Sequence, residues 1–407
     1  MIPRQRLDIG WSDFGFGVRA CLQLESRQAI AQRIESQWSA AGAGLVCLSV
    51  RSGFDALLTA LDFPAGAEIL VSAITIRGMI RIIEAHGLVP VPIDLDMTRL
   101  AVCPESLARA ASTSTRSILV AHLFGSRMPM GPVVDFARDR QLLVIEDCAQ
   151  AYTGDHDCGH PGSDVSLFSF GPIKTATALA GGLLHFRDPA LRQAVAAQQA
   201  SWPVQSRWKF GVRLGKYALL MLLSERWVYR LFAGLCAACR ANPDRLINQS
   251  VRGFGEADFF RKIRQQPSAA LLALLERRLQ RFDRDRITQR IQRAEQLMAR
   301  LPGLQRPGTQ AIEHSHWVFP IQHEQPKWLR QFLWRQGFDA TQGGSSLFAV
   351  VPPTTRPETR PRQAEQALPQ LLYLPLHAGM SSADIEDLAQ ALEPIFPEKN
   401  HRASLPV

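Results

Sequence analysis

The stretch "VSLFSFGPIKTATALAGGLLHF" (Val165–Phe186) holds two apolar runs, 165–170 and 181–186, with a lysine, Lys174, in the segment between them. Continuous apolar runs of this length are typical of strands that are buried on both faces of a sheet. A lysine so close to a core costs several kcal/mol unless it is paired, neutralised or chemically engaged. Lys174 is therefore the first candidate for a functional residue.

Four apolar runs of the same kind precede this stretch, and helix-length segments separate them. They lie at 67–73, 89–96, 117–124 and 141–147. Strand-length runs that alternate with helical segments favour a mostly parallel sheet flanked by helices. We therefore expect an α/β fold in the first half of the chain.

A carboxylate, Asp147, ends the last of these four runs. Ligands of parallel sheets bind beyond the carboxyl ends of the strands, although an aspartate at this place can also simply cap the next helix. A desolvated lysine such as Lys174 is neutral more often and can attack an aldehyde. Together the two residues supply the imine-forming amine and the acid partner that a pyridoxal phosphate (PLP) site requires.

The sequence also resembles a known family. The segments "VIEDCAQAYTGD" (144–155) and "GSDVSLFSFGPIKTATALAGGLLHF" (162–186) look like the core of the DegT-type sugar aminotransferases, which are fold-type I PLP enzymes. Further similar segments lie at 49–61, 69–96 and 371–392. The resemblance implies a large domain with a mostly parallel sheet flanked by helices, followed by a smaller C-terminal α/β domain.

The resemblance implies a role for each matching residue of the core. Lys174 would hold PLP covalently and shuttle the substrate's proton, and Asp147 would keep the pyridine nitrogen protonated. Gln150 would hydrogen-bond the phenolic oxygen of the ring. Ser169 would contact the cofactor phosphate.

The same phosphate is expected at a helix that begins with Gly53, Phe54 and Asp55, because a helix N-terminus offers free backbone N–H groups to an anion. Two positions depart from the family pattern. Phe54 stands where the family has a threonine, and Ile76 stands where an aromatic residue would stack on the ring. The family's Asn-x-Arg-Met signature, which lends a partner-subunit asparagine to the site, is not found.

We expect three parts along the chain: a large PLP-binding α/β domain (1–204), a basic amphipathic helical insertion (205–255), and a helical connector with the small C-terminal domain (256–407). The insertion mixes aromatic side chains with Arg and Lys at short intervals over 206–241. Its helices would pack on the protein or across a dimer interface, which we favour, or would lie on a membrane surface.

Composition excludes several classes of protein. The chain has 407 residues, of which 46% are hydrophobic and 20% charged, so it is long enough for two domains with a sizeable core. Its net charge of +9 fits acidic partners, but no nucleic-acid-binding signature accompanies it. The lack of a secretory signal or a long apolar run, with seven scattered cysteines, predicts a cytoplasmic protein with reduced thiols.

Two smaller clusters of residues have a functional and a structural interpretation. His156, Cys158 and His160 could ligate a metal, but there is no second ligand pair at a recognised spacing, so we expect no metal site. The three arginines of the Pro/Arg-rich segment could meet a nucleotide diphosphate or could simply be solvated. They are Arg356, Arg360 and Arg362.

The expected activity is the transfer of an amino group from an amino acid, glutamate being the expected donor, to a nucleotide-linked keto sugar for surface polysaccharide or secondary metabolite synthesis. The resemblance also implies a homodimer. One alternative is a PLP-dependent sugar dehydratase, against which Lys174 argues because those relatives lack the lysine. Another is a non-catalytic partner or membrane-associated subunit, which Phe54, Ile76 and the missing asparagine motif favour.

Overall fold

The computed structural model describes residues 1–4, 7–39, 42–154, 158–239, 258–342 and 347–397. Its centre is a seven-stranded sheet of order β1-β11-β10-β9-β7-β2-β4. The five neighbouring strands β4, β2, β7, β9 and β10 run parallel to one another. Strand β11 pairs antiparallel with both β1 and β10. The seven strands are β1 (Gly44–Cys47), β2 (Glu68–Ser72), β4 (Val89–Ile93), β7 (Thr115–Ala121), β9 (Leu143–Asp147), β10 (Val165–Ser169) and β11 (Gly182–Phe186). The predicted α/β class and all six predicted strand regions are confirmed.

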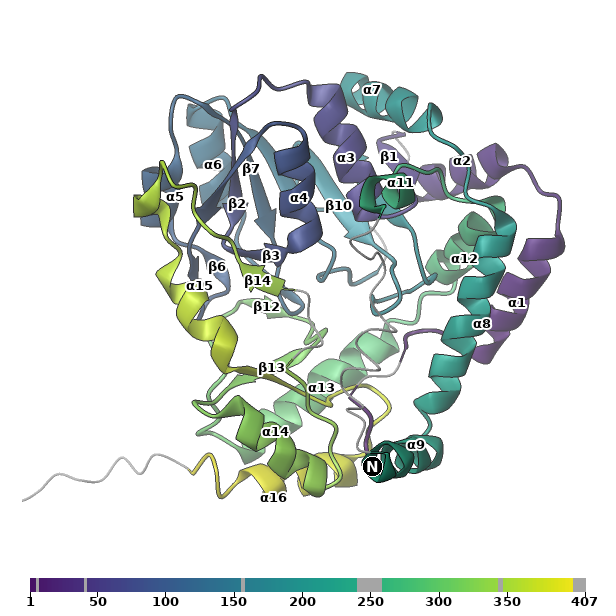
Figure 1. Ribbon diagram of the computed structural model, residues 1–407, viewed down its shortest axis with the longest axis vertical. Coiled ribbons are helices and arrows are strands. Elements are labelled where there is room, and N and C mark those ends of the chain that lie inside the picture. The colour runs from purple at the N-terminus through teal and green to yellow at the C-terminus, as the bar shows by residue number, and fades with distance from the viewer. Residues whose placement is uncertain (5–6, 40–41, 155–157, 240–257, 343–346, 398–407) are drawn as a thin grey trace, which may run out of the picture.

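Helices cover both faces of this sheet, which explains why its strands are apolar without alternation. In β2, Ile69 and Val71 pack toward one layer of helices and Leu70 packs toward the other. The first layer contains α3 (Val50–Leu61), α4 (Arg77–Ala85) and α7 (Pro189–Ala200), and the second contains α5 (Pro104–Ala110) and α6 (Gly131–Asp139). Figure 1 shows these helices around the sheet.

A further group of helices packs against the edge of the sheet that contains Val46, Phe168 and Leu183. It consists of α1 (Trp11–Leu22), α2 (Arg27–Trp38), α8 (Arg207–Leu223) and α12 (Ala269–Gln280). Phe210, Leu214 and Tyr217 are the buried residues of α8. The favoured interpretation of the insertion, helices packed on the protein, is therefore confirmed for this face of α8.

The C-terminal part builds a second core of its own, at the lower end of Figure 1. Its antiparallel pair is β13 (Phe319–Gln322) with β15 (Leu371–Leu374), and its helices are α13 (Asp285–Arg300), α14 (Pro326–Arg335) and α16 (Ser382–Leu392). Ile2 joins this core and bridges to Phe338, so the first residues of the chain lie with the last.

Short elements complete the described structure. Two strand pairs join the C-terminal part to the large sheet's layer: β3 (Ile74–Ile76) with β14 (Leu347–Ala349), and β8 (Ser126–Arg127) with β12 (Glu313–His314). The others are β5 (Leu95–Asp96), β6 (Ala101–Val102), α9 (Arg226–Ala238), α11 (Phe259–Ile263), α15 (Arg362–Ala367), η1 (Pro357–Thr359) and η2 (Leu368–Gln370). In the described residues no helix combines the length and the apolar character that a membrane crossing needs.

The three-part division of the chain stays a prediction. The contacts cut across its boundaries at two places: α12 packs with α1 and α8 on the large sheet, and Ile2 packs with the C-terminal core. Residues 240–257, which include the predicted boundary at 255, lie outside the described residues.

Candidate active site

A cavity of about 310 Å³ lies at the carboxyl ends of β9 and β10, where a parallel sheet is expected to bind its ligand. Five of the predicted site residues line it. They are Ile76, Asp147, Gln150, Ser169 and Lys174. Residues from the start of α3, from α8 and from β14 complete the wall, so the cavity is enclosed by parts of the chain that are far apart in sequence.

Lys174 lies in the turn after β10, and its backbone N–H donates to the carbonyl of Gly171 at 3.0 Å. Its ammonium nitrogen is 4.1 Å from the centre of the Trp317 ring. The indole N–H of Trp317 donates to the carbonyl of Ile173 at 3.0 Å, which fixes the ring beside the lysine. Trp317 was not identified from the sequence, since a tryptophan 143 positions downstream carries no signal of this contact.

The surroundings of Lys174 bring the pKa of its amine closer to neutrality. Burial lowers the pKa of this lysine from 10.5 to about 8, while the charge of Asp147 raises it and the charge of Arg51 lowers it. Arg51 lines the cavity from the first turn of α3 and was also missed from the sequence. The amine is therefore closer to its nucleophilic form at neutral pH than a surface lysine is.

Asp147 ends β9 and has the opposite shift. Burial raises the pKa of its carboxyl group, although the N–H of Ala149, at 2.9 Å, and the charge of Lys174 partly counteract this. Close by, the side-chain carbonyl of Gln150 accepts a hydrogen bond of 2.9 Å from the backbone N–H of Phe124. This bond fixes the orientation of the amide against the loop that follows β7.

The helix predicted to begin at Gly53 begins earlier, and that part of the prediction is wrong. α3 starts at Val50, and the side chain of Ser49 caps it by accepting from the backbone N–H of Ser52 at 3.2 Å. Ser49, Val50 and Arg51 are the residues of this helix start that line the cavity.

Gly53, Phe54 and Asp55 therefore lie past the first turn and do not line the cavity. A Cβ at Gly53 would meet Leu184 at 2.3 Å, so the glycine permits close packing of α3 on β11. Phe54 is fully buried in the core. The carboxylate of Asp55 accepts hydrogen bonds from Arg264 at 2.8 Å and from His86 at 3.1 Å, which makes it a buried structural anion.

The loop that follows Lys174 has an unusual backbone. Ala176 and Leu179 have φ values of 53° and 66°, which residues with a side chain adopt at a cost. The hydroxyl of Thr177 spans the loop: it donates to the carbonyl of Gly171 at 2.6 Å and accepts from the N–H of Leu179 at 2.9 Å. The path of the chain after the lysine is thus held from within.

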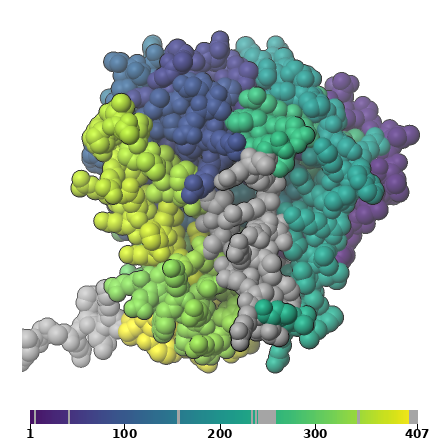
Figure 2. Space-filling view, viewed as in Figure 1, coloured from purple at the N-terminus to yellow at the C-terminus, as the bar shows by residue number. Residues whose placement is uncertain are grey.

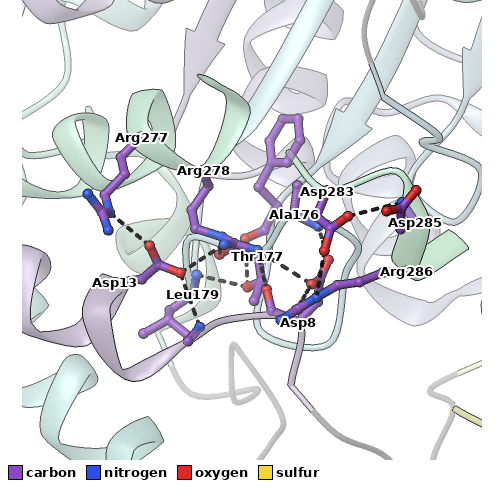
Figure 3. Close-up of polar contacts among 12 residues, drawn as sticks. Asp8, Asp13, Ala176, Thr177, Leu179, Arg277, Arg278, Asp283, Asp285 and Arg286 are labelled. Atoms are coloured by element: carbon purple, nitrogen blue, oxygen red, sulfur yellow. Dashed lines mark hydrogen bonds and ion pairs between the residues drawn. The ribbon is translucent and has the colours of Figure 1, made fainter. Parts of the chain in front are cut away.

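A network of charged residues holds the same loop from outside (Figure 3). Asp8 accepts from the N–H of Ala176 at 2.7 Å, and the guanidinium of Arg278 donates to the carbonyl of Thr177 at 3.2 Å. Arg278 also pairs with Asp13 at 2.8 Å. Because Asp8 and Asp13 come from the N-terminal segment and Arg278 from α12, two distant segments meet on the lysine loop.

Three cations of α8 face the cavity: Lys209, Arg213 and Lys216. Burial lowers the pKa values of Arg213 and Lys216, and in the described part of the chain no carboxylate acts on either one to raise it. The three residues recur every three or four positions, so they share one side of the helix. The sequence showed these residues as part of a basic helix but gave no sign that they border the cavity.

The C-terminal arginines do not reach the cavity, contrary to the suggestion that they meet a diphosphate. Arg356 pairs with Glu68 at 2.8 Å and donates to the carbonyl of Ala110 at 3.1 Å. Arg360 pairs with Glu365 at 2.7 Å. Arg356 thus ties its segment to β2 and α5 of the large sheet region.

Among the described residues His122, Glu146 and Cys148 offer ligand atoms to a metal. His122, however, uses both ring nitrogens: Nδ1 accepts from the N–H of Met128 at 3.1 Å and Nε2 lies 2.8 Å from Glu146. Glu146 also accepts from the N–H of His160 at 2.7 Å. The group is a hydrogen-bonded polar network behind Asp147; His156 of the other candidate cluster lies outside the described residues.

Solved structures resemble this fold over nearly the whole chain. The aminotransferase TlmJ from Streptoalloteichus hindustanus matches with a TM-score of 0.69 at 17% identity, over 97% of this chain and 98% of that one. The sugar aminotransferase CalS13 from Micromonospora echinospora matches with a TM-score of 0.66 at 18% identity, over 97% and 100%. The fold is that of the PLP-dependent sugar aminotransferases.

At the level of sequence, residues 30–208 match the model of the DegT/DnrJ/EryC1/StrS aminotransferase family. GDP-perosamine synthase of Escherichia coli O157:H7 is 29% identical over 43% of this chain and 50% of its own. The dTDP-3-amino-3,6-dideoxy-alpha-D-galactopyranose transaminase of Aneurinibacillus thermoaerophilus is 31% identical over 36% and 46%. The matches thus span about half the length of these relatives, and the resemblance seen in the sequence is confirmed.

A longer match reaches beyond the family core. The dTDP-4-dehydro-2,3,6-trideoxy-D-glucose 4-aminotransferase of Saccharopolyspora spinosa is 26% identical over 82% of this chain and 79% of its own. The similarity therefore extends past the sheet into the C-terminal part.

Proposed function

We propose that this protein is a PLP-dependent aminotransferase that moves an amino group from an amino acid, glutamate being the expected donor, to a nucleotide-linked keto sugar. One observation carries the proposal: an amine of lowered pKa, Lys174, and a carboxyl group, Asp147, line one cavity at the carboxyl edge of the sheet. The relatives whose names refer to GDP- and dTDP-linked sugars agree with it.

The residues of the cavity fit PLP by their chemistry. Lys174 would hold the cofactor covalently, and Asp147 would pair with the ring nitrogen. Gln150 would face the phenolic oxygen. Ser169 and the free N–H groups at the start of α3 would hold the phosphate, because a helix N-terminus attracts an anion. Bound PLP would supply the electron sink that stabilises a carbanion at the substrate's α-carbon.

The chain's own residues would do the proton chemistry. The lowered pKa of Lys174 would let its amine accept a proton from the α-carbon of the substrate and release that proton again later in the reaction. The carboxylate of Asp147 would accept a hydrogen bond from the protonated ring nitrogen, and the charge of Lys174 counteracts the rise in the carboxyl pKa that burial causes. Trp317 restricts where the lysine amine can lie, since its ring centre is 4.1 Å away. Ile76 would cover one face of the ring with an aliphatic surface.

Both proposed substrates are anions, and the cations of α8 suit them. Lys209, Arg213 and Lys216 border the same cavity, so a carboxylate or phosphate entering it meets positive charge. We include in the proposal a cytoplasmic location, which rests on the sequence features given above. A homodimer and a role in polysaccharide or secondary metabolite synthesis are included too, and they rest on the family resemblance.

The alternative of a non-catalytic partner loses one of the three observations that favour it. Phe54 stands where the family has a threonine, but it is fully buried in the core and does not line the cavity. The phenylalanine at this position is therefore explained by core packing. Among the residues that line the cavity, Ile76 remains a departure from the family pattern. Lys174 continues to argue against a dehydratase.

The first half of the reaction tests the proposal. The purified protein loaded with PLP should convert glutamate to 2-oxoglutarate in an amount stoichiometric with the active sites, without any sugar present. Lys174→Ala should form none above background, and Lys209→Ala should form it more slowly. If the PLP-loaded wild type formed neither 2-oxoglutarate from glutamate nor the corresponding 2-oxo acid from any other amino acid, the proposed activity would be contradicted.

A further inference from the structure

Helix α8 exposes a continuous apolar stripe in addition to its buried face. Trp208, Val212, Leu219 and Leu222 are 79%, 57%, 59% and 47% exposed. They recur at intervals of four, seven and three positions, so they lie on one side of the helix along about 21 Å of its axis. Figure 2 shows this part of the chain, in teal, along the right-hand surface. Ordinary surface helices do not present such a stripe to water.

The stripe has a basic flank. Lys209 and Lys216 are exposed beside it, and the segment from Arg207 to Leu223 contains no Asp or Glu. The next helix, α9, repeats the composition: Trp227 and Leu231 are 70% and 62% exposed and accompany exposed arginines. Tryptophan at the end of an apolar stripe, with lysines at its side, is the composition of a helix that lies in the headgroup region of a bilayer.

Charge favours a membrane over a contact between two copies of α8 as the occupant of this face. A two-fold contact that placed α8 against α8 would bring the lysines of both copies together without a carboxylate on either helix. Anionic headgroups supply the missing negative charge at each lysine. We propose that the exposed face of α8 binds peripherally to an anionic membrane surface, with Trp208 and Leu219 inserted and Lys209 and Lys216 at the headgroups.

This placement would bring the cavity to the membrane. Lys209, Val212 and Lys216 belong both to the exposed face and to the lining of the cavity. The cavity would therefore lie beside the lipid headgroups. If the proposed aminotransferase function holds, its nucleotide-linked acceptor would reach the cavity at that surface; the membrane contact itself does not depend on that function.

Vesicle flotation of the full-length protein tests the proposal. We expect binding to vesicles of phosphatidylcholine with phosphatidylglycerol, weak binding to phosphatidylcholine alone, and release at high salt. The double substitution Trp208→Ser with Leu219→Ser, neither of which lines the cavity, should weaken binding at least about tenfold. The matched control is Ile312→Ser with Val351→Ser, which changes side chains that are 80% and 75% exposed elsewhere, and it should bind as the wild type does.

The contrary outcomes are distinct. Failure of the wild type to float with anionic vesicles, or equal loss in the control pair, would overturn the proposal. A wild-type dimer in light scattering that the Trp208/Leu219 pair converts to a monomer, without any vesicle binding, would assign the face to a second copy. Formation of 2-oxoglutarate is measured in solution without vesicles. A failure of the proposed activity can therefore be distinguished from a failure of membrane binding.

Discussion

The carboxylate of Asp8 accepts a hydrogen bond of 2.7 Å from the backbone N–H of Ala176, although the two residues are 168 positions apart. Ala176 follows Lys174 by two residues and has a φ of 53°. A left-handed conformation at a residue with a Cβ persists only where its surroundings hold it. The N-terminal segment thereby helps to set the position of the lysine.

Asp8→Ala should therefore weaken the retention of PLP. Loss of this hydrogen bond leaves the left-handed conformation, which costs about 1–2 kcal/mol, without its external support, so we expect roughly tenfold weaker affinity. Asp8→Asn keeps an acceptor and should restore most of the affinity. A spectrophotometric titration of the apo-protein with PLP measures both. Asp135→Ala, which removes an exposed surface partner of Arg138, is the control.

If Asp8→Ala lost thermal stability but kept the PLP affinity of the wild type, the contact would be purely structural. Equal losses of affinity in Asp8→Asn and Asp8→Ala would contradict the role of the hydrogen bond, because the asparagine retains the acceptor and lacks only the charge.

The pH dependence of PLP attachment should report the lowered pKa of Lys174. Only the neutral amine attacks the aldehyde, so the rate should rise with pH and level off above a midpoint near 8, well below the ordinary 10.5. Asp147→Asn removes a charge that raises this pKa and should move the midpoint down. Arg51→Met removes a charge that lowers it and should move the midpoint up. Stopped-flow absorbance at a series of pH values gives the midpoints, and shifts of the opposite sign would refute the assignment.

Gly53→Ala should reduce stability without touching the cavity. Its new methyl group would lie 2.3 Å from Leu184 and 3.1 Å from Cys47, so we expect a loss of about 1–3 kcal/mol in the free energy of unfolding. Gly15→Ala in α1 is the matched control, since nothing lies within 4 Å of that Cβ, and it should be neutral or stabilising by about 0.5–1 kcal/mol. Urea unfolding measures both. A large loss of PLP affinity in Gly53→Ala at unchanged stability would place this glycine on the cofactor instead.

The sequence predicted the sheet well because its signal is local. The apolar runs that became β2, β7, β9 and β10 must be buried on both faces, and their ends fix where Asp147 and Lys174 meet. The start of α3 was misplaced because the resemblance set it at Gly53, whereas the side chain of Ser49 caps the helix before Val50.

Residues that reach the site through tertiary packing left no local signal. Trp317 contacts Lys174 from the C-terminal part, Arg51 enters with the earlier helix start, and Arg213 enters from the insertion helix. Asp8 left no local signal either, because a single aspartate near the N-terminus does not indicate a contact with the lysine loop. Such contacts follow from how the layers stack, which single-sequence patterns do not encode.

The visible absorption spectrum of the protein with PLP tests the central claim most directly. The wild type should show the visible band of lysine-bound cofactor, and glutamate should replace it with the near-ultraviolet band of the amine form. Lys174→Ala should bind PLP without the lysine-dependent band. A wild-type protein that shows no such band at saturating PLP, or a Lys174→Ala variant that keeps it, would contradict the assignment of Lys174 and the account built on it.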